Sequence, residues 1–178
     1  MRLFARREGV PVDVVARAGL PRGESALAHA RAADSTWLLG TRRSLVVVPA
    51  DGAARRIPWE QVEDAAWDQD TSRLRLTEIG VYGEQRPAYS FEMDDPAHLL
   101  QLVRERVTAS IVLQRWVPVR GRQGVTVIGR RSPVGGAVTW MHAYDADLDP
   151  HDPLVAAVAD QALAAARAEV GEPGTDPI

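Results

Sequence analysis

Three residue types are absent from this chain of 178 residues: cysteine, lysine and asparagine. Without cysteine there is no disulfide, no thiolate nucleophile and no thiolate metal ligand. Without lysine there is no phosphate-loop lysine, no Schiff base and no lysine general base. All 21 positive charges are therefore arginines, beside 27 alanines, a bias that the coding of a GC-rich genome explains. These absences exclude several large classes of enzyme.

Long apolar runs are also absent. A membrane-spanning helix needs about 20 consecutive, mostly apolar residues, and no segment approaches that length. The first 21 residues carry arginines but interrupt their apolar positions with Glu8, Pro11 and Asp13, unlike the apolar core of a signal peptide. We therefore expect a cytoplasmic protein. The length suits one domain or two small units, and the composition is that of a soluble globular chain.

Short β-strand signals dominate the first half. Leu74 and Leu76 alternate with polar residues, which indicates a half-buried strand, and Asp51-Gly52 is a hairpin signal. Asp94-Asp95-Pro96 predicts the start of a helix. The acids between the fourth and fifth expected strands, such as Glu63, Asp64, Asp68 and Asp70, read as exposed turn residues. The expected strands cover residues 25–32, 36–40, 44–49, 54–59, 72–79 and 88–93.

This succession of short strands and one amphipathic helix resembles the bacterial form of the pleckstrin-homology-like fold, over about residues 23–108. The resemblance is carried by "GESALAHARA", by "LLGTRRSLVVV" with its threonine-led turn before an apolar strand, by "RRIPWEQV" and by the helix. It implies an antiparallel β-meander closed by a helix. It also implies a binding scaffold for proteins, peptides or lipid headgroups, without fixing which.

The rest of the chain predicts a second α+β unit over residues 109–170. "ASIVLQRWVPVRG" favours a strand from about Ser110, with a continued helix as the alternative; "GVTVIGRR" and "AVTWMHAYD" complete a three-stranded meander. A C-terminal helix follows, with Asp152 as N-cap and Pro153 in the first turn. Residues 1–22 are expected to form a loose N-terminal arm, and residues 171–178 a disordered tail.

Charge is unevenly distributed over a chain whose net charge is −3. Residues 106–144 hold six arginines and no acid, whereas residues 145–178 carry a net charge of −7. Arginine binds phosphate bidentately and stacks on bases, so an arginine-rich hairpin suits RNA or an acidic protein surface. The alternative is that the acidic last segment covers the hairpin and cancels its charge. The candidate residues are Arg115, Trp116, Arg120, Arg122, Arg130 and Arg131.

Trp140, His142 and Tyr144 share one face of a predicted strand. If this face is open, the three rings form a ligand face that stacks a base or another ring. If the face is turned toward the last helix, the same residues belong to the core.

Two arginine pairs, Arg42-Arg43 and Arg55-Arg56, fall near consecutive turns of the first meander. The family resemblance makes them candidates for anion binding, because pleckstrin-like domains that bind phosphoinositides place basic residues in such loops. The alternative is a solvated sheet edge.

No catalytic or metal-binding pattern is found in the sequence. Asp145, Asp147, Asp149 and His151 alternate as in a calcium loop, but Pro150 stands where the loop needs glycine. The four histidines show no HExxH spacing, and neither GxSxG nor GxGxxG occurs. We therefore expect no cofactor, no metal and no enzymatic activity.

The sequence thus favours a non-enzymatic binding or adaptor module that recognises a protein partner. The alternative is a nucleic-acid- or ribosome-associated protein that uses the arginine-rich hairpin. A weaker alternative is binding to anionic lipid through the two arginine pairs. No small-molecule substrate is identified.

Overall fold

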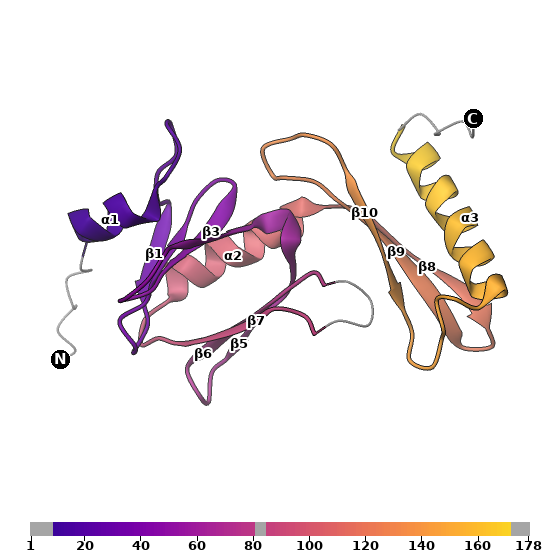
Figure 1. Ribbon diagram of the computed structural model, residues 1–178, viewed down its shortest axis with the longest axis horizontal. Coiled ribbons are helices and arrows are strands. Elements are labelled where there is room, and N and C mark those ends of the chain that lie inside the picture. Colours follow the sequence, from indigo (N-terminus) through magenta and orange to yellow (C-terminus); the bar gives the residue numbers. More distant parts are fainter. Residues whose placement is uncertain (1–8, 81–84, 172–178) are drawn as a thin grey trace. The chain divides into compact units, whose positions relative to one another are not determined.

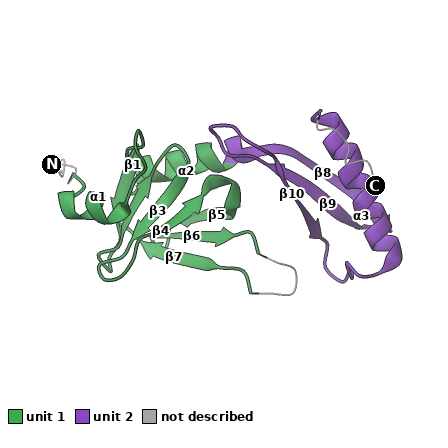
Figure 2. Cartoon of the chain, turned by 45° about the horizontal axis from the view of Figure 1, so that its top comes forward, with its two compact units in different colours: residues 1–107 green, residues 108–178 purple. Residues whose placement is uncertain are grey.

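The computed structural model describes residues 9–80 and 85–171, and the chain divides into two compact units, residues 1–107 and 108–178 (Figure 1, Figure 2). The described part contains three antiparallel sheets and three α-helices, which confirms the expected α+β class. Within this part, no helix is both long enough and apolar enough to cross a membrane.

Two antiparallel sheets form the framework of the first unit. Their strand orders are β1-β2-β3-β4 and β5-β6-β7, so neighbours in sequence are neighbours in space. The first sheet contains β1 (Ala28–Arg31), β2 (Trp37–Gly40), β3 (Ser44–Val48) and β4 (Arg55–Pro58). The second contains β5 (Val62–Asp68), β6 (Arg73–Glu78) and β7 (Ala88–Glu92), and a short 3₁₀ turn, η1 (Trp59–Gln61), leads into it.

Helix α2 (Ala97–Ser110) packs against the inner faces of both sheets. Its apolar side chains Leu99, Leu102 and Val103 are buried, as their helical spacing predicts. Gly40 of β2 allows the close approach, because a Cβ there would lie 2.6 Å from Leu102 Cδ2. The main core of the unit therefore consists of the helix and the inner faces of the two sheets.

The prediction of a loose N-terminal arm over residues 1–22 is wrong for part of this segment. Val12–Ala18 forms helix α1, and Val14 and Ala18 are buried on the outer face of the first sheet. Arg17 Nη1 donates a 2.7 Å hydrogen bond to the Pro49 carbonyl. The physical reason lies in β2 and β3, whose every residue is buried: a sheet that is apolar on both faces needs a cover on its second face.

Strand β5 was not expected, since its acids suggest an exposed turn. It pairs with β6, but its register shifts between Val62 and Asp64. This β-bulge interrupts the alternation of apolar and polar residues on which strand prediction depends. Beyond the bulge Ala65 and Trp67 pack against the core while Ala66 is exposed.

The second unit is a three-stranded sheet with one helix. The strand order is β10-β9-β8, and helix α3 packs on β8 and β9. The expected strand from about Ser110 is confirmed. The elements are β8 (Ile111–Arg120), β9 (Gln123–Arg130), β10 (Thr139–Tyr144) and α3 (Pro153–Glu169). The predicted tail lies outside the described residues from residue 172 onward.

The start of α3 follows the predicted capping chemistry. Asp152 is the N-cap, and its carboxylate accepts hydrogen bonds from the backbone N–H groups of Leu154 and Val155. Pro153 occupies the first helical position, where its missing N–H costs nothing. Val155, Ala159, Ala162 and Ala166 form the buried stripe that faces the sheet.

Candidate functional site

The acidic C-terminal segment neutralises part of the arginine-rich hairpin. Arg115 forms an ion pair with Glu169 near the end of α3, and Arg120 Nη2 lies 2.8 Å from Asp152 Oδ2 at its start. Both arginines belong to β8, and the acids that pair with them lie at opposite ends of α3. For these two residues the uncompensated charge that would attract RNA does not exist.

The remaining hairpin arginines are not brought together. Arg130 is only 4% exposed and donates a hydrogen bond to Ser110 Oγ. Arg122 precedes the first residue of β9 and Arg131 follows its last, so these two exposed cations lie at opposite ends of an eight-residue strand. The structure therefore forms no continuous basic surface from the predicted set.

Trp116 lies on the face of the second sheet away from α3. Its indole covers Gly124 of β9, where a Cβ would lie 2.7 Å from Trp116 Cζ2. Trp116 Nε1 donates a 3.2 Å hydrogen bond to Asp145, which also accepts one from the Gly124 N–H. The ring is thus fixed in place although its residue remains 48% exposed.

The three aromatic residues of β10 lie on the α3 side of the sheet. His142 and Tyr144 pair in register with Val127 and Val125, which are both fully buried. Trp140 packs against the cluster formed with α3, and its ring lies directly over Gly129. All three side chains are half-buried. Their position supports the core alternative over an open stacking face.

The two arginine pairs of the first unit do not form one anion site. Arg42 and Arg43 lie in the β2–β3 turn, whereas Arg55 pairs with Val47 toward the other end of β3. Arg43 lies 3.7 Å from Glu24, and Arg56 donates to the Gly19 carbonyl. The guanidinium groups of Arg43 and Arg56 thus contact groups of the first unit.

Arg55 joins the two sheets of the first unit. Its Nη2 lies 2.6 Å from Glu78 Oε1, and the Tyr89 hydroxyl donates to the same oxygen at 2.6 Å. The guanidinium also lies over the Tyr89 ring. Burial, followed by the hydrogen bond to Glu78, raises the pKa of Tyr89 to about 12. Arg55 therefore has a structural role, because it links β4 of the first sheet to β6 and β7 of the second.

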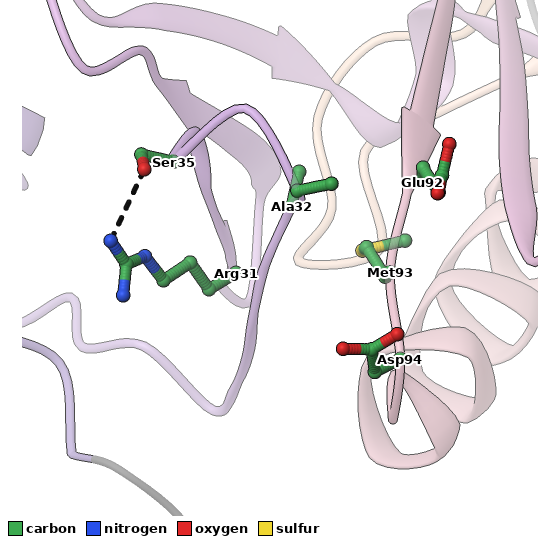
Figure 3. Close-up of a pocket in the computed structure, with 7 residues that line it drawn as sticks. Arg31, Ala32, Ser35, Glu92, Met93 and Asp94 are labelled. Carbon is green, nitrogen blue, oxygen red and sulfur yellow. Dashed lines mark hydrogen bonds between the residues drawn. The ribbon is translucent and has the colours of Figure 1, made fainter.

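A cleft of about 370 Å³ lies between the β1–β2 turn and the end of β7 (Figure 3). The Ala33 N–H donates a 2.9 Å hydrogen bond to the Glu92 carbonyl and so ties the two walls together. Ser35 closes the turn at φ +68°, a backbone conformation that is uncommon outside glycine. The cleft is lined by Arg31, Ala32, Ala33, Ser35, Glu92, Met93 and Asp94.

The cleft combines charges of both signs with an apolar floor. Arg31 donates to Ser35 Oγ on one wall, while Asp94, two residues after the end of β7, belongs to the other wall and points its carboxylate toward the Arg31 side (Figure 3). Glu92 is engaged with Arg73 at 2.7 Å. Ala32 and Met93, both buried, connect the cleft to the core. Sequence reasoning missed this site because its walls are about 60 residues apart in sequence and neither carries a motif.

Two of the alternating acids after β10, Asp145 and Asp149, have structural roles, as does Asp152. Asp145 holds Trp116 and Gly124, Asp149 accepts a hydrogen bond from the His151 N–H, and Asp152 caps α3. Within residues 9–80 and 85–171, no three His, Asp or Glu side chains gather closely enough to hold a metal ion.

A comparison with protein-family models, with curated proteins and with solved structures finds no match to the chain.

Proposed function

We propose that the chain is a non-enzymatic adaptor module that recognises a protein partner through the cleft of its first unit. The observation that carries this proposal is the lining of the cleft. One wall offers the guanidinium of Arg31, the other offers the carboxylate of Asp94, and the exposed Ala33 offers a methyl group, while Ala32 and Met93 of the lining are buried. A polypeptide supplies all three complementary chemistries, whereas a polyanion is repelled by Asp94 and Glu92.

We also propose that the first unit has a pleckstrin-homology-like fold, which would be consistent with the same function. Four antiparallel strands, then three, then a helix packed on both sheets is the succession that such domains show, and they are mostly binding scaffolds. In this proposal the unit presents a rigid cleft, because the main-chain hydrogen bond from Ala33 to Glu92 joins the β1–β2 turn to the end of β7. Rigid binding sites lose less conformational entropy when a partner docks.

The nucleic-acid and lipid alternatives both depend on exposed, unpaired arginines, and most of the arginines concerned are paired or buried. Arg115 and Arg120 face carboxylates, and Arg130 is buried. Arg55 and Arg56 contact groups of their own unit. Exposed Arg42, Arg122 and Arg131 are isolated from one another along the chain, and affinity for phosphate backbones grows with the number of contacting cations.

The test is recovery of the tagged full-length chain from its native cells, with and without nuclease. We expect a protein that co-purifies in stoichiometric amount and survives nuclease treatment. Loss of all partners on nuclease treatment would favour RNA instead. Recovery of the chain alone, in monodisperse form, would contradict the adaptor function.

A further inference from the structure

Strand β8 is an unusually long edge. It has ten residues, and among the described strands it pairs with β9 alone. Natural proteins protect such edges with short strands, lysines or inward charges, since an open edge pairs with other chains. The sequence of β8, IVLQRWVPVR, contains no lysine and no acid. Pro118 lies near the end of the strand, and the register with β9 shifts between Ile111 and Leu113 and again between Pro118 and Arg120, so the regular part of the edge runs from Leu113 to Pro118.

The hydrogen bonds of the neighbouring strand show which backbone groups of β8 lie at the free edge. Gly124 directs both its N–H and its carbonyl toward Asp145, on the β10 side. Because antiparallel pairing alternates, Val125 and Val127 direct theirs to β8, where they face Val117 and Arg115. Gln114, Trp116 and Pro118 therefore direct their backbone groups outward. Pro118 fits this assignment independently, since a strand tolerates proline where no ladder N–H is needed.

The charges of β8 are already neutralised. Arg115 and Arg120 would repel a second copy of the same strand, but each is paired with a carboxylate from the α3 segment. At the centre of the edge lies Trp116, the most exposed aromatic side chain of the second unit among those described. An edge with free hydrogen-bonding groups, an exposed indole and no net repulsion is suited to its own copy.

We infer that β8 pairs antiparallel with β8 of a second copy, across a two-fold axis at Trp116. Each Trp116 N–H then donates to the Trp116 carbonyl of the other copy, and each Gln114 N–H donates to the Pro118 carbonyl. Two three-stranded sheets become one six-stranded sheet, with both α3 helices on one face. A two-fold dimer is the commonest closed assembly, and it removes both copies of the open β8 edge.

This register also places side chains favourably. Arg115 lies opposite Val117 of the other copy, so the two Arg115 residues do not face each other. The two indoles flank the axis on the face away from α3 and cover each other's exposed area. Cross-strand aromatic pairs of this kind stabilise antiparallel sheets.

The test is the molar mass of the full chain in solution, by light scattering and sedimentation equilibrium from micromolar to millimolar concentration. We expect twice the 19.4 kDa of one chain. Gln114→Pro removes an outward N–H and no bond to β9, so it should shift the mass to that of the monomer. The matched control, Gln114→Ala, keeps the N–H and should remain dimeric.

Amide hydrogen exchange of the wild type provides a second test, which remains valid even if the Gln114→Pro variant does not fold. The Gln114 and Trp116 amides should be protected at high protein concentration and exchange rapidly on dilution. A wild type that is monomeric throughout would overturn the inference, whatever other protein it binds. So would a dimer in which these two amides exchange rapidly at every concentration.

Discussion

Arg120 donates a 2.8 Å hydrogen bond to Asp152, whose carboxylate also caps the first turn of helix α3. One acid therefore neutralises the arginine-rich hairpin and starts the helix that covers it. This arrangement favours the hypothesis that the acidic segment covers the hairpin, because an arginine paired with a helix cap is poorly placed to contact phosphate.

This double role makes a prediction about pH. The hydrogen bond from Arg120, followed by that from the Leu154 amide, holds the pKa of Asp152 below its ordinary value of 3.8. A carboxyl whose pKa is lower in the folded state stabilises the fold above its unfolded pKa, and this contribution is lost as the pH falls through the lowered value. The Asp152→Asn variant keeps a side-chain oxygen that can cap the helix but removes the negative charge that pairs with Arg120. The gap in melting temperature between it and the wild type should be present at neutral pH, begin to shrink near the ordinary pKa of 3.8, and close as the pH falls through the lowered pKa of Asp152. An equal gap at neutral pH and below the lowered pKa would contradict this role.

The raised pKa of the Tyr89 phenol should make the fold less stable at alkaline pH. Its pKa is raised to about 12 by burial and by Glu78, so between pH 10 and about 12 the unfolded chain ionises this group while the folded chain does not. The free energy of unfolding should therefore fall over this range. Tyr89→Phe should flatten the fall, as measured by urea unfolding at several pH values. An unchanged slope would show that Tyr89 is not the group responsible.

Two glycines under tryptophans provide a matched pair of substitutions. At Gly129 a new Cβ would meet the Trp140 ring, at 2.7 Å from Cζ3, whereas at Gly124 it would meet both the Trp116 ring and the Val117 carbonyl. A ring can turn aside more easily than a backbone group can move. Gly124→Ala should therefore destabilise the chain more than Gly129→Ala, as measured by chemical denaturation. The reverse order would show that the Trp140 ring is the less adaptable neighbour.

We expect truncation to alanine to reduce the free energy of unfolding by different amounts at Leu74 and Leu163. Leu74 is 1% exposed in the main core of the first unit, so Leu74→Ala should cost about 2–4 kcal/mol of unfolding free energy. Leu163 is only partly buried beside the small cluster under α3, and its truncation should cost less. Denaturant unfolding of both variants measures the difference. Equal costs would mean that the two clusters are equally well packed.

The elements that local chemistry specifies could be predicted from the sequence. Alternating apolar residues predict β6, and the Asp152 cap followed by Pro153 predicts the start of α3. Helix α1 and strand β5 could not be predicted in this way. The first is held by a sheet face that the sequence does not show, and the second contains a bulge that breaks its period. The cleft could not be predicted either, because the bond from Ala33 to Glu92 that forms it is a tertiary contact.

The central claim, that the cleft recognises a protein, is tested most directly by reversing one of its charges. Asp94→Arg alters the cleft, while Asp51→Arg makes the same change in the exposed loop between β3 and β4. Both tagged variants should retain the melting temperature of the wild type to within a few degrees. We predict that the nuclease-resistant partner is lost from Asp94→Arg and retained by Asp51→Arg. Equal retention of the partner by both variants would contradict the account.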